Sequence, residues 1–106
     1  MEDIAALTKL LAEVVRFLEQ YEVRGWNKWF SESVELLDRN HEAGIEKVLN
    51  SFGGMGSFND LVICATNQHR IADADESAVN DQLDLYRTDI YQLATQARCN
   101  AWKHSE

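Results

Sequence analysis

The sequence predicts an all-α protein, a compact bundle of about five helices with a glycine-rich corner between the third and the fourth. Apolar residues recur at steps of three and four over most of the chain, which is the period of an amphipathic helix. The chain contains no proline, so the commonest helix breaker is absent. At 106 residues it is expected to form a single domain that buries a core without metal or disulfide.

The first two helices are expected at residues 2–22 and in the segment that begins at Trp26. An apolar stripe marks the first helix: Ile4, Leu7, Leu11, Val14, Leu18 and Tyr21. Gly25 follows this helix, and we expect it to end the helix. The second helix places its apolar residues on one side: Trp26, Trp29, Phe30, Val34 and Leu37. Asn40 can break or cap it.

A third, short helix is expected to end at Phe52, because its apolar residues fall at i, i+3, i+4 and i+7. These residues are Ile45, Val48, Leu49 and Phe52. Three of the five glycines follow at once, in Gly53, Gly54 and Gly56. Gly53 or Gly54 can close the helix in a left-handed cap, and Gly56 lets the backbone turn again.

After the corner, Ser57 and Asp60 have the spacing of a capping box, which favours a fourth helix. Its apolar side would hold Phe58, Leu61, Val62 and Ala65. Residues 61–64 are also β-branched enough for a strand, although no partner strand is visible. Residues 65–72 are expected to form a loop.

Asp73 and Glu76 repeat the capping-box spacing and are expected to open the last helix, of about 25 residues. Its apolar pattern steps by four and three through Val79, Leu83, Tyr86, Ile90, Leu93, Ala97 and Ala101. Trp102 closes this pattern.

Motif analysis predicts no catalytic residue, metal site or cofactor, and so no enzyme. The glycine corner lacks the strand and the lysine of a phosphate loop, and it contains neither GxGxxG nor GxSxG. A structural corner is therefore favoured over an anion or ligand site, with Asn59 and Asp60 fixing the loop. His41-Glu42 lacks the second histidine of HExxH, since position 45 is Ile45. The two cysteines show no CxxC spacing.

The formal charge of −8 argues against nucleic acid or an anionic membrane as partner and favours a basic one. No basic leader and no long apolar run is present, so a cytoplasmic location is expected. Between residues 73 and 89, six acids face a single base, Arg87. These acids either stabilise a helix N-terminus and keep the protein soluble, or form a negative face that covers a basic site.

The run from Phe52 to Leu61, FGGMGSFNDL, resembles a GGMGS-(Phe/Leu)-Asn-Asp segment found in a family of small bacterial proteins. Some of these resemble immunity proteins of contact-dependent inhibition and related polymorphic toxin systems. The resemblance implies a cytoplasmic inhibitor that binds one cognate toxin domain, often a nuclease, and blocks its active site. The glycine motif, with Gly53, Gly54, Gly56, Ser57, Asn59 and Asp60, is then expected to be a shared scaffold.

The acids of the last helix are the expected partner-binding residues: Asp73, Asp75, Glu76, Asp81 and Asp84. Glu32, Glu35 and Asp38 form a second acidic face. Two alternatives stay open. One is a helical interaction module that self-associates and has no link to toxins, and the other is a small-ligand binder that uses the loop from Gly53 to Asp60.

Overall fold

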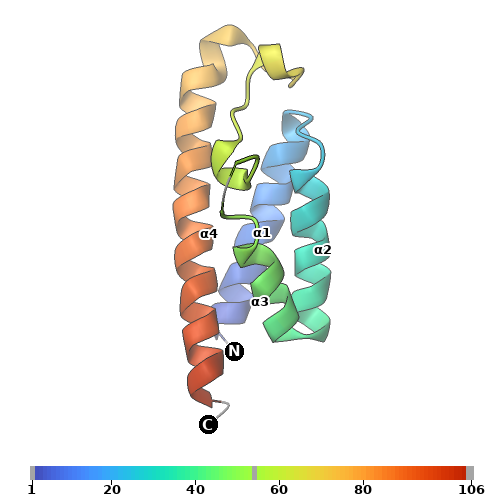
Figure 1. Cartoon of the computed structure of the whole chain (residues 1–106). Coiled ribbons are helices and arrows are strands. Elements are labelled where there is room, and N and C mark those ends of the chain that lie inside the picture. The colour runs from blue at the N-terminus through green and yellow to red at the C-terminus, as the bar shows by residue number, and fades with distance from the viewer. Residues whose placement is uncertain (1, 54, 105–106) are drawn as a thin grey trace.

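The computed structural model describes residues 2–53 and 55–104 and confirms the all-α class, with no strand in these ranges. Four α-helices are present (Figure 1): α1 (Glu2–Gln20), α2 (Trp26–Arg39), α3 (His41–Leu49) and α4 (Glu76–His104). Three short 3₁₀ turns lie between α3 and α4: η1 (Phe58–Asp60), η2 (Ala65–Asn67) and η3 (Asp73–Asp75).

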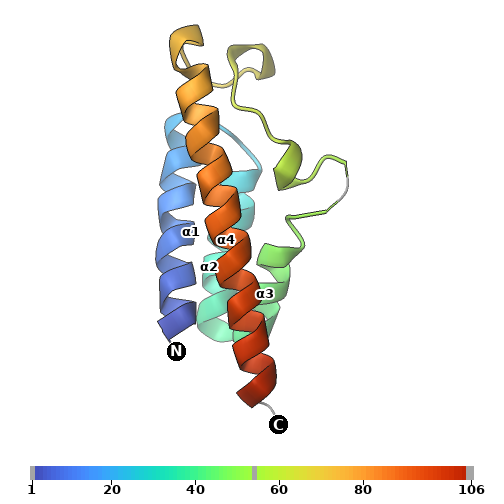
Figure 2. The same cartoon turned by 90° about the vertical axis from the view of Figure 1, so that its left-hand side faces the viewer.

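The helices form a ring of neighbours around one core. α1 packs against α2 and α4, and α3 packs against α2 and α4. The molecule measures 50 × 23 × 20 Å, and α4 runs along its whole length. The short α3 covers only the end near the termini, whereas residues 58–71 lie beside the other half of α4 (Figures 1 and 2). A non-helical segment therefore takes the fourth position of the bundle in that half.

The core combines the expected helix stripes with two residues of the non-helical segment, Phe58 and Ile63. Both are fully buried. Phe58 packs edge-on against Phe30, with ring centroids 4.8 Å apart, and its ring lies 5.5 Å from that of Trp26. Burying one such side chain contributes roughly 1.5–3 kcal/mol, so this segment is an integral part of the fold.

The end of α1 corrects the expectation for Gly25. Glu22 adopts φ +54°, and its N–H donates to the Glu19 carbonyl, while Val23 N–H donates to the Leu18 carbonyl. These two bonds form a Schellman motif, with the buried side chains of Leu18 and Val23 as its apolar contact. Gly25, at φ +97°, is instead the N-cap of α2.

Asn40 is both the C-cap of α2 and the N-cap of α3. Its N–H donates to the Leu36 carbonyl, and its side-chain oxygen accepts from Ala43 N–H at 3.1 Å. Gly44 then lets α3 lie directly on α2, because a Cβ at this position would be 2.7 Å from the backbone nitrogen of Leu37. The two helices therefore meet at a tight corner.

The prediction of a fourth α-helix after the corner was wrong. Only η1 forms there, and residues 61–64 run in an extended conformation that pairs with no strand in the described chain. α3 also ends at Leu49 rather than at Phe52.

The last helix forms in the predicted place, but it is longer than the expected length of about 25 residues and starts differently. The residue before η3 is Ala72, which makes no side-chain cap, and the Glu76 carboxylate accepts from Ala65 N–H at 3.0 Å. The expected capping box of Asp73 and Glu76 therefore does not form. α4 spans 29 residues. The side chain of Trp102 lies outside the described part.

Candidate functional site

The glycine-rich corner is a loop whose two ends are fixed at Ser51. Phe58 N–H donates to the Ser51 carbonyl at 2.8 Å, and the fully buried Ser51 hydroxyl donates to the Val48 carbonyl at 2.6 Å. The middle of the loop projects away from the bundle (Figure 2). Fixed ends and a projecting middle make this loop the most distinctive surface feature of the chain.

Two glycines set the path of this loop. Gly53 has φ +152° and Gly56 has φ +77°, and a Cβ at either position would meet nothing within 4 Å. Their backbone conformation, not the available space, therefore requires glycine. Gly53 does not cap α3, because Asn50 at the helix end is right-handed. Gly54 lies outside the described residues.

The three polar residues of the motif hold the second half of the loop. Ser57 Oγ accepts from Asn59 N–H at 3.3 Å, and Asp60 Oδ2 accepts from Gly56 N–H at 2.7 Å. The expected capping box between Ser57 and Asp60 does not form, because each side chain accepts from a neighbour of the other residue, at either end of a single 3₁₀ turn. Of the two residues expected to fix the loop, Asp60 holds the Gly56 N–H through its side chain, whereas the side chain of Asn59 is exposed to solvent.

The same geometry disfavours anion binding at this loop. An anion would need free backbone N–H groups. The Gly56 N–H is already bonded to the Asp60 carboxylate, which also places a negative charge at the turn.

Arg87 of α4 fastens the loop and the extended segment to the bundle. Its Nε donates to the Phe58 carbonyl at 3.1 Å, and its Nη2 donates to the Leu61 carbonyl. Its Nη1 pairs with Asp84, and the guanidinium lies 5.7 Å from the centre of the Phe58 ring. Only 16% of the Arg87 side chain is exposed. Sequence reasoning did not find this role; the one signal was a lone base in an acidic run.

Asn80 holds the next part of the extended segment. Its side-chain amide donates to the Ile63 carbonyl and accepts from the Ile63 N–H, both at 2.8 Å. Glu76, one turn earlier on α4, accepts from Ala65 N–H. One face of α4 thus supplies the hydrogen bonds that a neighbouring strand would otherwise supply.

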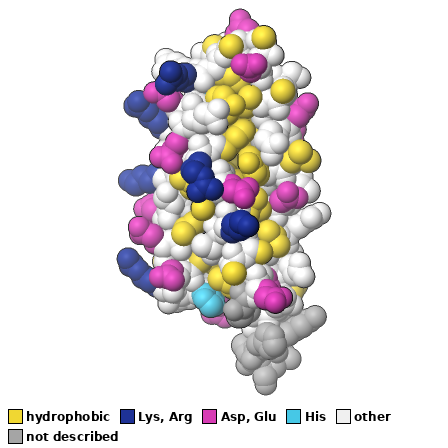
Figure 3. Space-filling model, turned by 180° about the vertical axis from the view of Figure 1, so that it is seen from behind, with side chains coloured by type: hydrophobic (Ala, Val, Ile, Leu, Met, Phe, Trp, Pro, Cys, Tyr) yellow, Lys and Arg dark blue, Asp and Glu magenta, His cyan; other side chains and the backbone are white. Residues whose placement is uncertain are grey.

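The structure divides the five predicted partner-binding acids into two groups. Glu76 and Asp84 make internal contacts, although 68% of the Asp84 side chain stays exposed. Asp73 and Asp75 lie exposed in η3, and Asp81 lies exposed on α4. Seen from behind (Figure 3), Asp and Glu side chains are visible on the side that α4 forms, while Lys and Arg side chains are visible over the middle and the opposite side. The exposed Arg98 lies further along α4.

The second acidic face lies on α2. Glu32, Glu35 and Asp38 are all exposed, and Glu32 is 4.0 Å from the Lys47 ammonium group. Lys47 also lies 3.8 Å from the centre of the Trp29 ring. Part of this face is therefore neutralised by a neighbouring base.

A groove of about 490 Å³ runs between the glycine loop and α4. It is lined by Phe52, Gly53, Asn59, Arg87, Thr88, Tyr91 and Gln92. Met55, in the projecting part of the loop, is 100% exposed, and Tyr91 is half exposed. Apolar surface is thus presented to solvent beside the loop.

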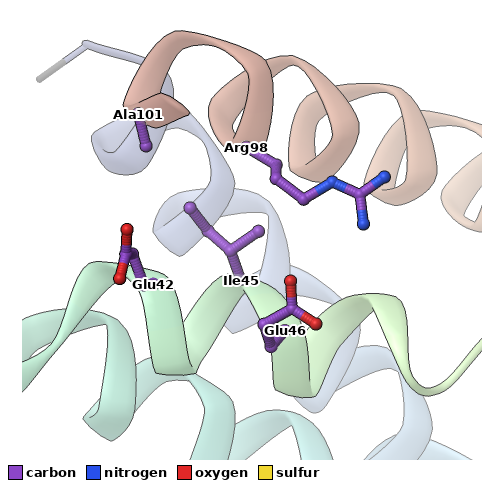
Figure 4. A pocket seen from close by; sticks show the side chains of 5 residues that line it. All are labelled: Glu42, Ile45, Glu46, Arg98 and Ala101. Carbon is purple, nitrogen blue, oxygen red and sulfur yellow. The ribbon is translucent and has the colours of Figure 1, made fainter. Parts of the chain in front are cut away.

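A second groove lies between α3 and α4 (Figure 4). Glu42 and Glu46 of α3 flank Ile45, and Arg98 and Ala101 of α4 form the opposite side. No salt bridge joins Arg98 to either carboxylate. Within the described ranges, no group of His, Cys, Asp and Glu side chains could hold a metal ion.

No helix within residues 2–53 and 55–104 combines the length and apolar content that crossing a bilayer requires. No curated protein and no solved structure matches the chain significantly. Residues 19–72, half of the chain, match a domain of unknown function, DUF6966. This range contains α2, α3, the glycine loop and the extended segment, and it ends just before η3. The chain therefore belongs to the DUF6966 family.

Proposed function

We propose that this chain is an immunity protein, a stoichiometric inhibitor that binds one basic nuclease toxin domain in the cytoplasm and covers its active site. The resemblance of the FGGMGSFNDL run to segments of such proteins supports this proposal. The acidic surface of the chain supports it independently, because a nuclease groove that holds a phosphate backbone is itself basic.

The observation that carries the proposal is the placement of Arg87. It is the only base among six acids between residues 73 and 89, and its guanidinium is turned inward onto two backbone carbonyls. The exposed acids Asp73, Asp75 and Asp81 therefore have no exposed base among them in this stretch. A partner approaching η3 and the first turns of α4 meets these three exposed acids, and the nearest exposed base along the chain is Arg70, before η3.

Such a surface acts mainly on the association rate. Complementary charge steers two proteins together and raises the association rate well above that of a neutral pair, and the effect falls as salt screens it. Fast association suits an inhibitor that must reach its toxin before the toxin reaches nucleic acid.

Affinity capture of the tagged full chain from its native host, at low and then high salt, tests the proposal. We expect a small basic domain in near-equal amount, whose nuclease activity disappears when one equivalent of the inhibitor is added. Empty beads, when the toxin-bearing gene is shown to be expressed, would overturn the proposal.

Charge reversal then tells the two acidic faces apart. Asp81→Lys with Asp84→Lys is expected to slow association with the captured domain and to weaken its salt dependence. The matched control, Glu35→Lys with Asp38→Lys, reverses two charges on α2. If only the control slows association, the α2 face is the contact and the α4 face is not.

A further inference from the structure

We propose that the toxin domain is anchored at an apolar patch formed by Phe52, Met55 and Tyr91. This inference rests on the proposed function and adds the place where binding energy is concentrated. The acids of α4 steer the partner, whereas this patch, beside the glycine loop, holds it. In protein interfaces, a few central side chains, with tyrosine prominent among them, carry most of the affinity, and methionine is enriched in the contact surface.

The patch is built from two separate parts of the chain. Phe52 comes from the start of the loop and Tyr91 from the middle of α4, and their rings meet edge-on with centroids 5.5 Å apart. Both line the groove described above. Tyr91 is 51% exposed, so half of its surface faces solvent while its ring contacts Phe52. Such a ring is already ordered before a partner arrives.

Met55 extends the patch from the loop. Its side chain has no burial at all, although removing a large apolar side chain from water is favourable. The residues that follow are held by the bonds from Gly56 to Asp60 and from Asn59 to Ser57. The loop therefore displays a flexible apolar side chain on a hydrogen-bonded base, which lowers the entropy lost on binding.

The charges beside the patch indicate which kind of partner binds there. Asp60 follows on the loop and Asp84 lies on α4, two turns before Tyr91, and both are exposed. Arg87 also lines the groove, but only 16% of its side chain is exposed and it is paired with Asp84, so the exposed charges beside the patch are the two acids. Such a border fits a partner that brings Lys or Arg around an apolar pocket, and an arginine could also stack on Tyr91. A second copy of this chain would instead bring its own acids against these, on a molecule of charge −8.

The test uses the full chain and the basic domain recovered from the native host, with the dissociation constant measured by calorimetry. Tyr91→Ala is expected to weaken binding at least about 30-fold and Met55→Ala about 10-fold, as central anchors do. Tyr91→Phe keeps the ring and should change binding less than about threefold. Met55→Ala changes a fully exposed side chain, so its result does not depend on a change in folding.

Val62→Ala is the matched control, since Val62 is also 51% exposed but neither lines the groove nor belongs to the glycine loop. It is expected to change binding less than about twofold. If the wild-type chain binds and both alanine variants bind equally well, this inference is overturned and the proposed function stands. If the wild-type chain itself fails to bind any basic domain, the proposed function falls first. A dimer in sedimentation velocity that Met55→Ala abolishes would make a second copy the occupant and overturn the inference.

Discussion

The half of the bundle around α3 and the half around residues 58–71 are held together in different ways. In α1, α2 and α3, backbone groups bond mainly within their own helix, and side chains add the Asn40 cap and one bond between helices, from the Trp29 indole to the Lys47 carbonyl. In the segment from Phe58 to Ala65, backbone groups bond to side chains of α4 that lie 11 to 29 residues away in sequence. The structure of the first half follows mainly from contacts that are local in sequence. The conformation of the second half depends on hydrogen bonds to α4.

The largest effect tests whether the non-helical segment is as much a part of the core as a helix is. Phe58→Ala and Phe30→Ala each remove a fully buried ring and should each lower the free energy of unfolding by about 3–5 kcal/mol. Urea unfolding followed by circular dichroism measures both. A cost for Phe58→Ala far below that for Phe30→Ala would show that the segment is peripheral.

The next largest effect on stability is expected at Arg87, whose guanidinium on α4 bonds to the segment that begins at Phe58. Arg87→Met keeps much of the apolar stem but leaves the Leu61 carbonyl without its side-chain donor, and should lower the free energy of unfolding by about 2–3 kcal/mol. Asp84→Asn is the control, because 68% of the Asp84 side chain is exposed and the loss of its charge should change stability by less than about 0.5 kcal/mol. Equal effects of the two changes would assign the stability to the ion pair instead.

A smaller effect on stability is expected at Asn80, whose side chain bonds to both backbone groups of a single residue of the extended segment, Ile63. Asn80→Ala removes the partners of the Ile63 N–H and carbonyl, and should cost about 1–2 kcal/mol. Hydrogen exchange should show a faster Ile63 amide while the amides of α1 keep their rates. Asn80→Asp retains the acceptor for the Ile63 N–H and should protect this amide in part. Uniform acceleration across the chain would contradict a local role.

The smallest expected effect tests whether the helical half also depends on a tertiary contact, here the close packing of α3 on α2 at Gly44. Gly→Ala at an exposed site inside a helix normally stabilises by about 1 kcal/mol. At Gly44 the new Cβ would be 2.7 Å from the Leu37 backbone, so Gly44→Ala should instead destabilise by about 1 kcal/mol net. Thermal unfolding gives the sign. A raised melting temperature would mean that α2 and α3 separate easily.

The local half of the fold could be predicted from the sequence. The stripes of α1 and α4 place the residues that are buried, and Asn40 caps as its side chain suggests. The end of α1 was missed because Glu22 occupies a left-handed position where glycine is usual. The sequence feature that indicates this helix end is the apolar pair Leu18 and Val23, because such a pair accompanies a Schellman motif.

The other half could not be predicted, for a physical reason. The apolar run at residues 61–64 is compatible with helix, strand or extended chain, and the choice depends on Asn80 and Arg87, which no local pattern connects to it. In the candidate site, the turn at Ser57 and Asp60 was predictable because its side-chain bonds span only two and four residues, although their partners are Asn59 and Gly56. The patch of Phe52 and Tyr91 was not, since its rings come from positions 39 residues apart in the sequence.

The bonds from α4 have a consequence for how this family is delimited. The stretch shared with DUF6966 ends at residue 72, yet the side chains that complete its hydrogen bonding begin at Glu76. The unit recognised by sequence similarity is therefore smaller than the unit that folds. Residues 19–72 produced alone would lack α4, which covers one side of the core. The conserved-family region is therefore only part of the segment that folds.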